Sequence, residues 1–368
     1  MKRLFAMILA ASMAATMLAG CGSSSSGSSA PAASAPAASA PADAASEPAA
    51  PTGARDPKDT KVVLICDPVG TNPFLTQMLT GLENAEAKYE GLTTSVVECQ
   101  DTAVWEDNIR AAVQEENDLI IVAGGQGADA INAVADEFSE DATYVLVDVE
   151  SDNPNVKSIS FKEQEGAYLI GMIAGLVNPN NKFGGVHANE GQSSYKWRWG
   201  YMEGIKAVRD DVNDDSFIFN FTNSYTDAAK AKEFALQQFA AGCGFINAAS
   251  AVADFGTFEA AKEKGFYTSG QDEDRTDPDN PNIITTQLKD TSVVIDRVVG
   301  QYMDGTLTMD PESYGIKEGV IGALYITSEG KNPRNTEVLT DEIVAQVKEA
   351  ADKIAKGELV LEVPMENA

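Results

Sequence analysis

Histidine and cysteine are scarce in this chain of 368 residues. His187 is its only histidine, and no motif surrounds it, so we expect it on the surface or in a loop rather than in a catalytic role. The four cysteines form no Cys-x-x-Cys pair and no Cys/His cluster, which argues against a metal site. Gly-x-Ser-x-Gly, His-Glu-x-x-His and the phosphate-binding Gly-x-x-x-x-Gly-Lys-Ser/Thr are also absent. We therefore expect no catalytic residues, no metal and no cofactor.

Basic residues are outnumbered as well. The 27 lysines and arginines face 56 aspartates and glutamates, for a net charge of −29. If the first twenty residues are removed, Lys2 and Arg3 are lost, and 25 basic residues face 56 acidic ones, for a net charge of −31. Such a surface repels nucleic acid, so nucleic acid is excluded as a partner. Beyond the first residues, the most apolar stretch is the eleven-residue run Ala167–Val177, which is shorter than the ~20 residues of a membrane span.

The first twenty residues have the pattern of a secretory signal. Lys2 and Arg3 precede an apolar run from Leu4 to Leu18, and small residues follow. The end of this run, Leu18-Ala19-Gly20-Cys21, resembles the lipobox of bacterial lipoproteins. The resemblance implies cleavage before Cys21, acylation of its thiol and new amine (palmitate being the expected kind of acyl chain), and attachment to the outer side of the cell membrane. A plain secretory signal with a chance cysteine is the alternative.

Residues 21–58 follow as a segment of serine, alanine and proline with almost no bulky apolar side chain. Such a composition cannot bury enough surface to offset the entropy of ordering, which predicts a disordered tether.

From Lys61 onwards, short apolar runs alternate with segments of helical periodicity. Runs at 62–66, 119–122 and 144–147 end at Asp67, at Gly124-Gly125 and at Asp148. Helices are expected from Phe74 to Tyr89 and around Ile131 to Phe138. Strands that are apolar throughout, separated by helices, predict an α/β fold with a parallel sheet covered on both faces.

A second series of the same kind begins after Phe161. Helices are expected at 167–177, 200–208, 258–264 and, after the N-cap Thr340, up to Gly357; strands are expected at 182–186, 217–221, 245–248 and 266–268. This repetition predicts two doubly wound lobes, residues 59–160 with 289–312 and residues 161–288 with 313–368, joined by a three-strand hinge. Ligands bind at the carboxyl ends of such strands, where Asp67, Gly124, Asp148, Ala251 and Asp272 fall.

Three cysteines remain besides Cys21. Cys66 and Cys99 lie in apolar strand-like runs, where cysteine usually acts as a small hydrophobic residue. A bond between them requires neighbouring strands, and the sequence leaves this open.

Several segments, in order and spacing, resemble the basic membrane protein family of ABC-transporter receptors, which includes bacterial purine-nucleoside receptors. They are Asp118-Leu-Ile-Ile-Val-Ala-Gly-Gly125, Phe161-Lys-Glu-Gln-Glu-Gly166, Tyr225-Thr-Asp-Ala-Ala-Lys230, Gly256-Thr-Phe-Glu-Ala-Ala-Lys-Glu-Lys-Gly265 and Gly270-Gln-Asp-Glu-Asp274. The resemblance covers about 300 residues. It implies a type I periplasmic-binding-protein fold whose lobes close on a nucleoside, and partners that are the permease and ATPase subunits of an importer.

The resemblance also implies roles for individual residues. Phe74 and Tyr225 would stack on the two faces of the base, and Asp272 would accept hydrogen bonds from the ribose hydroxyls. Lys289 would reach the ligand or pair with Asp272. Asp67 and the turn Gly124-Gly125 would line the same cleft.

Some residues depart from the family pattern. Asn72-Pro73-Phe74 and Gln287 resemble the sugar-binding branch of the same fold, and Ala251-Val252 replaces the usual Gly-Gly. A receptor for a free pentose or related sugar therefore stays open beside the nucleoside receptor. A lipid-anchored sensor without transport and an extracellular enzyme acting on nucleosides are the two further readings. For the enzyme, Asp272 and Asp274 could mimic an acid–base pair. Two carboxylates that are two residues apart at the end of a strand, however, more often bind hydroxyls or cap a helix.

Overall fold

The computed structural model describes residues 53–365. The predicted secretory signal, the predicted lipidation site Cys21 and most of the predicted tether lie outside this range. Among the described residues, no helix is both long and apolar enough to cross a membrane. The fold begins earlier than the predicted tether boundary at residue 58. Arg55 stacks 3.8 Å from the ring centre of Tyr302, and its backbone N–H donates to the carbonyl of Met303, so these contacts order the chain from there.

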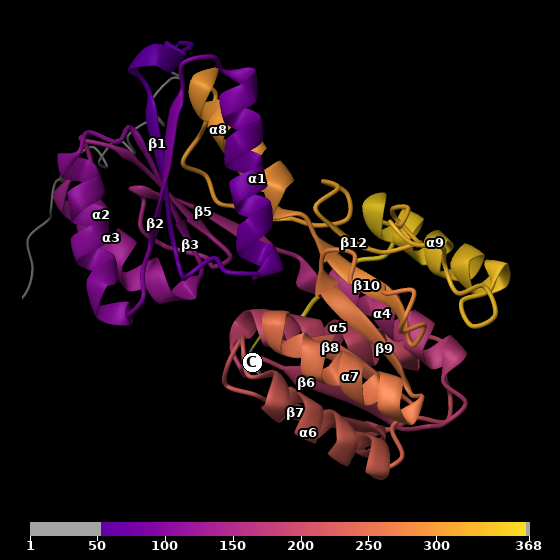
Figure 1. The fold of residues 1–368 in the computed structure, drawn as a ribbon. Helices are drawn as coiled ribbons and strands as arrows, with labels where there is room; N and C mark the ends of the chain where they lie inside the picture. Colours follow the sequence, from indigo (N-terminus) through magenta and orange to yellow (C-terminus); the bar gives the residue numbers. More distant parts are fainter. Residues whose placement is uncertain (1–52, 366–368) are drawn as a thin grey trace, which may run out of the picture. The chain divides into compact units, whose positions relative to one another are not determined.

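The first sheet has the strand order β11-β5-β4-β3-β1-β2, and all its pairs are parallel. Its strands are β1 (Lys61–Cys66), β2 (Thr93–Glu98), β3 (Leu119–Ala123), β4 (Thr143–Val147), β5 (Val156–Phe161) and β11 (Glu312–Tyr314). The covering helices are α1 (Pro73–Lys88), α2 (Trp105–Gln114), α3 (Ala128–Glu137) and α8 (Thr291–Met303). Helix α8 comes from far along the chain and lies beside α1 (Figure 1).

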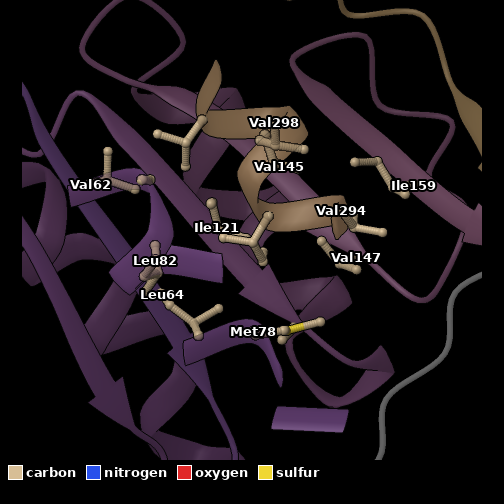
Figure 2. Packing of buried hydrophobic residues seen from close by; sticks show 14 of the residues in the cluster. Val62, Leu64, Met78, Leu82, Ile121, Val145, Val147, Ile159, Val294 and Val298 are labelled. Carbon is tan, nitrogen blue, oxygen red and sulfur yellow. The ribbon is translucent and has the colours of Figure 1, made fainter. Parts of the chain in front are cut away.

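Burial on both faces explains why these strands are apolar throughout. Val62 and Leu64 of β1 point into the cluster beneath α1 and α8, whereas Val63 and Ile65 point into the cluster beneath α2 and α3. Figure 2 shows the first cluster, where Met78 of α1 and Val294 and Val298 of α8 lie against the strands. The predicted parallel sheet is thereby confirmed for this half of the chain.

The second sheet has the order β12-β10-β9-β8-β6-β7, which repeats the winding of the first. Its strands are β6 (Phe183–His187), β7 (Phe217–Phe221), β8 (Phe245–Ala249), β9 (Tyr267–Asp272), β10 (Ile283–Lys289) and β12 (Ile321–Ala323), of which only β12 runs antiparallel. The helices are α4 (Glu163–Val177), α5 (Gln192–Lys206), α6 (Ala228–Ala240), α7 (Asp254–Lys264) and α9 (Asp341–Ala355). We call the two sheets with their helices lobe 1 and lobe 2.

Helices α4 and α5 pack with their backbones in close contact. A methyl group on Gly204 would lie 2.0 Å from the carbonyl oxygen of Tyr168, and one on Gly171 would lie 2.2 Å from that of Tyr201. No side chain fits at either position, so the glycines allow the close approach that fixes α5 on the sheet. Helix α5 also begins at Gln192, well before the predicted start at Gly200.

The chain passes between the sheets three times. It leaves lobe 1 after β5, returns between β10 and α8, and leaves again between β11 and β12. In the last passage, Ile316 packs against the main cluster of both lobes. The third crossing therefore follows Tyr314, whereas the predicted lobe boundary was at residue 312.

The three cysteines in the described part of the chain are free and buried. Cys66 and Cys99 lie at the ends of paired strands, and the N–H of Cys99 donates to the carbonyl of Cys66 over 2.7 Å. Burial raises the pKa of the Cys66 thiol to about 12, so it remains protonated and unreactive.

Candidate ligand-binding site

A cavity of about 810 Å³ lies where the carboxyl ends of strands from both sheets meet. Lobe 1 contributes the residues after β1, β3 and β4 together with the start of α1. Lobe 2 contributes the residues after β6, β7 and β8, the first turns of α5, and the last residues of β9 and β10. A cavity of this size accommodates a small organic molecule.

The cavity is lined by every residue that the sequence singled out for ligand binding except Gln287. From lobe 1 these are Asp67, Asn72, Phe74, Gly124, Gly125 and Asp148. From lobe 2 they are Tyr225, Ala251, Asp272 and Lys289. Gln287 is fully buried, and its Nε2 donates to the backbone carbonyl of Glu163 over 2.9 Å.

Two of the aromatic side chains come from opposite lobes. Phe74 lies in the first turn of α1, where Asn72 is the N-cap and its Oδ1 accepts from the N–H of Phe74 at 3.1 Å. Tyr225 follows β7, is 42% exposed, and its hydroxyl accepts from Asn189 Nδ2 at 2.9 Å. Trp197 of α5 adds a third ring to the lining. The cavity thus offers flat apolar faces from both sides of the cleft.

The strand ends share an unusual backbone conformation. Gly124, Asp148, Ala251 and Asp272 have φ values of 94°, 90°, 56° and 68°. Residues other than glycine adopt a positive φ at a cost of order 1–3 kcal/mol each, and residues with such backbone strain cluster at functional sites. The N–H of Ala251 donates to Gln271 Oε1 at 3.1 Å, which holds this turn in place. Glycine adopts positive φ without this cost, so Ala251 holds the turn in a conformation that glycine would adopt more readily.

A buried lysine joins the two lobes at the base of the cavity. Lys289, 4% exposed, ends β10 of lobe 2 and pairs with Asp148 of lobe 1 and, over 3.2 Å, with Glu163 Oε1 at the start of α4. Its ammonium also lies 4.2 Å from the ring centre of Phe161 and 5.2 Å from that of Phe74. Burial alone would lower the pKa of Lys289, but the carboxylates of Asp148, Glu163 and Asp272 outweigh it and raise the pKa.

Glu163 connects this lysine to helix α5. Ser193 Oγ donates to Glu163 Oε1 over 2.9 Å, and Lys196 Nζ lies 3.6 Å from Oε2, an ion-pair distance. Lys196 also donates to the carbonyl of Phe161 over 3.0 Å. The sequence did not reveal Glu163, Ser193 and Lys196 because α4 and α5 begin earlier, at Glu163 and Gln192, than the helices predicted at 167–177 and 200–208.

Asp272 is the most buried carboxylate of the lining, with 3% exposure. Burial raises its pKa to about 6, although Lys289 and the hydrogen bond from Gln271 oppose the rise. Gln271 Nε2 donates to Oδ2 over 2.9 Å. Gln77 of α1 reaches the backbone carbonyl of Asp272 over 3.4 Å and so links the two lobes. The carboxylate thus forms part of the cavity wall, and Asp272 is held by groups from both lobes.

His187 lies at the end of β6, fully buried and part of the cavity wall, so its predicted surface or loop position is wrong. Its ring packs 5.5 Å from that of Phe219. Burial, helped by Arg198, lowers its pKa to about 3, which keeps the ring neutral at physiological pH. The described residues contain no cluster of three or more metal-ligating side chains.

Two amide side chains that the sequence did not reveal also line the cavity. Gln126 Nε2 donates to Asp67 Oδ2 over 2.9 Å, and Asn189 contacts Tyr225 as described. Both follow strand ends, where a polar residue without a motif carries little signal.

Comparison with known proteins agrees with this architecture. The chain is 27% identical over 314 residues to basic membrane protein A of Borreliella afzelii, covering 82% of this chain and 91% of that one. It is 25% identical over 278 residues to a CD4+ T-cell-stimulating antigen of Listeria innocua, covering 70% and 73%. A crystal structure of an ABC transporter solute-binding protein from Aeropyrum pernix shares the fold, with a TM-score of 0.70 and 23% identity over 83% of this chain and 94% of that one.

The family match spans the described fold and confirms the resemblance seen in the sequence. Residues 58–364 match the family described as PnrA-like ABC transporter substrate-binding proteins. Members of this family bind a substrate for a transporter, so the chain is a binding protein rather than an enzyme. This chain belongs to the PnrA-like family of ABC transporter substrate-binding proteins.

Proposed function

We propose that this protein captures a purine nucleoside between its two lobes and delivers it to the permease and ATPase subunits of an importer, while a lipid on Cys21 holds it at the outer face of the cell membrane. The observation that carries the proposal is that one cavity combines aromatic rings from both lobes, Phe74 and Tyr225, with the buried carboxylate of Asp272. A nucleoside presents the matching groups, a flat base and a diol.

The aromatic pair favours a planar ligand over a sugar alone. Stacking on a ring adds about 0.5–1.5 kcal/mol beyond the burial of apolar area. Phe74 and Tyr225 come from different lobes, so a base between them would connect the lobes as well. A free pentose is smaller than a nucleoside and has no aromatic ring to stack between the two side chains.

Asp272 supports the ribose half of the ligand. An ionised carboxylate accepts two hydrogen bonds from a cis-diol, each worth about 1.5–3 kcal/mol. Asp272 lies in the cavity wall, where Gln271 donates to its Oδ2. The other oxygen has capacity for a ligand hydroxyl.

The charges of the lining favour an uncharged nucleoside over a nucleotide. Asp67, Asp148 and Asp272 contribute negative charge, and both lysines of the lining, Lys196 and Lys289, are already paired with carboxylates. Glu163 lies near the start of α5 and accepts from Ser193. A phosphate would therefore meet like charge without a free cation to compensate.

The same geometry supports a closing movement of the two lobes. Ligand contacts from both lobes favour the closed arrangement only when the cavity is filled. Three chain crossings allow rotation about one axis while they resist twisting. A closed, filled form would then be the one that the permease receives.

The sugar-binding alternative rests on Asn72 and Gln287. In the structure, Asn72 Oδ1 caps α1 and Gln287 is held at the carbonyl of Glu163, outside the cavity lining. Gln287 therefore does not line the cavity, and the side-chain oxygen of Asn72 is already engaged at the start of α1. We therefore retain the sugar only as an outcome of the following test.

Isothermal titration calorimetry with inosine, guanosine, adenosine, inosine 5′-phosphate and D-ribose tests the proposal. We expect a nucleoside to bind more than tenfold tighter than ribose, because only the base fills the space between Phe74 and Tyr225. The 5′-phosphate should bind more weakly than inosine. Ribose binding as tightly as any nucleoside would replace the proposal with the sugar receptor.

Replacement of Phe74 or Tyr225 by alanine should weaken inosine binding by more than tenfold, about 1.4 kcal/mol. The folded state should keep most of its melting temperature, because Tyr225 is 42% exposed and Phe74 is only partly buried. Phe255→Ala, a 52% exposed ring outside the cavity lining, is the matched control and should leave affinity unchanged. A large loss of stability at unchanged affinity would mean that both side chains stabilise the hydrophobic core rather than bind the ligand.

A further inference from the structure

We propose that the segment after α9 forms a third wall of the ligand cavity and that Met365 contacts the bound nucleoside. The inference rests on the proposed function and adds to it a binding residue outside the strand ends and helices. Met365 is partly buried and lines the cavity together with Phe74, Tyr225 and Trp197. It lies more than 70 residues beyond Lys289, the preceding lining residue along the chain.

The path of the segment is fixed by contacts with lobe 2. After Gly357, whose φ of 72° ends α9, the N–H groups of Glu358 and Leu359 both donate to the carbonyl of Lys353. Leu359 and Leu361 then pack against the main apolar cluster of lobe 2. Gln164 Nε2 on α4 donates to the carbonyl of Leu361 over 3.3 Å. The segment is thus held on the outside of α4 only a few residues before Met365.

The anchored stretch continues along α5. A shallow second hollow is bordered by Tyr168 of α4, by Trp199 and Glu203 of α5, and by residues 359–362 of the segment. Trp197 and Lys196, near the start of the same helix α5, line the main cavity. The segment therefore follows α4 and α5 towards their cavity end, where Met365 joins the lining.

The chemistry of methionine suits a contact with a flat ring. Its thioether is flexible and polarisable, and sulfur–aromatic contacts are favourable. The neighbouring parts of the lining on α5, Ser193 and Lys196, are polar and already bonded to Glu163. Met365 adds an apolar surface there, which a base would fill and a free sugar would not.

The test compares the parent with Met365→Ala and Met365→Leu in calorimetry with inosine. Release rates are measured by intrinsic tryptophan fluorescence, to which Trp197 of the cavity lining contributes. We expect alanine to weaken inosine binding about three- to tenfold, chiefly through faster release, because it removes the apolar packing against the ring together with the sulfur. Leucine, which keeps the volume, should stay within about twofold of the parent. Met309→Ala, a 38% exposed methionine outside the cavity lining, should change nothing.

A second measurement separates this inference from the proposed function. In protein labelled with ¹³C at the methionine methyls, the resonance lost in Met365→Ala identifies Met365, and it should shift when inosine is added to the parent. Failure of the parent to bind inosine would overturn the proposed function and this contact with it. Two outcomes would contradict the contact with Met365 and leave the proposed function intact. They are an unshifted Met365 methyl resonance when the parent binds inosine, and an alanine variant that binds inosine as tightly as the parent or more tightly.

Discussion

Lys289→Met should destabilise the protein by about 3–5 kcal/mol, the cost of removing one partner from a buried ion pair. The substitution keeps much of the side-chain length but leaves Asp148 and Glu163 without the ammonium that pairs with both. Glu163 is fully buried and keeps the neutral hydrogen bond from Ser193, but Lys196 at 3.6 Å is the one cation still paired with it among the described residues, so the negative charge that remains is poorly compensated. Urea unfolding at neutral pH measures the loss. Lys206→Met, at a lysine that is 37% exposed and paired with Glu203, should cost less than about 1 kcal/mol.

The loss should depend on pH in a defined direction. The pKa values of Asp148 and Asp272 are already raised by burial, while Lys289 opposes the rise. Without Lys289 these pKa values rise further above their unfolded values. A carboxyl group whose folded pKa lies above its unfolded pKa takes up its proton more readily in the folded state, so folding gains stability as the pH falls. The deficit of Lys289→Met should therefore shrink between pH 8 and pH 5. A deficit that grows on acidification, or that is below 1 kcal/mol at pH 7, would contradict the account of this cluster.

Asp272→Asn should weaken inosine binding by about 1.5–3 kcal/mol, or roughly 10- to 150-fold, because a neutral amide is a poorer acceptor for a diol. The fold should tolerate this change. Asparagine adopts positive φ more readily than most residues, and position 272 has a φ of 68°. Calorimetry provides the affinity, and Asp352→Asn on the exposed side of α9 is the control.

The same carboxylate makes binding by the parent sensitive to pH. Asp272 has a pKa of about 6, so it is ionised at pH 7.5 and mostly protonated at pH 5. Nucleoside affinity should fall by about tenfold over this range, since one pH unit below the pKa leaves about a tenth of the groups ionised. The asparagine variant should show a flat profile and should discriminate less against 2′-deoxyinosine than the parent does. If the affinities of parent and variant depended on pH in the same way, Asp272 would not be a ligand contact.

The residues at the strand ends could be predicted because their position depends on the sequence immediately around them. A strand buried on both faces needs an unbroken apolar run, and the residue at which the run ends is placed at the rim of the sheet. Asp67, Gly124 and Asp148 are such residues, and all line the cavity. Gln287 shows the limit of the same reasoning. It shares a face of β10 with Lys289 but lies two residues earlier, about 6–7 Å back along the strand, where α4 covers it.

The contribution of α5 to the site could not be predicted, for a different reason. Its first turns, Gln192-Ser-Ser-Tyr-Lys-Trp-Arg198, are polar and have no apolar periodicity, because they face the cavity and Glu163 rather than the core. The position of His187 was mistaken because burial in a strand of lobe 2 depends on the rings of Phe219 and Phe221, which come from a neighbouring strand. Met365 gave no signal at all, since only the path of the chain after α9 brings it to the cavity.

The return of the chain into lobe 1 at α8 has a consequence for the order in which the protein is made. The apolar face formed by β1, β3 and β4 is covered by α1 and by Val294, Ile295, Val298 and Val299 of α8. Strands β6 to β9 of lobe 2 form one continuous stretch of the chain and are made before α8. When the chain has been made as far as β9, lobe 1 therefore still lacks α8 and has part of one face exposed to water. The N-terminal lobe, although synthesised first, can finish folding only after most of the other lobe has emerged. Until then its open face is the part of the nascent protein on which a chaperone can bind.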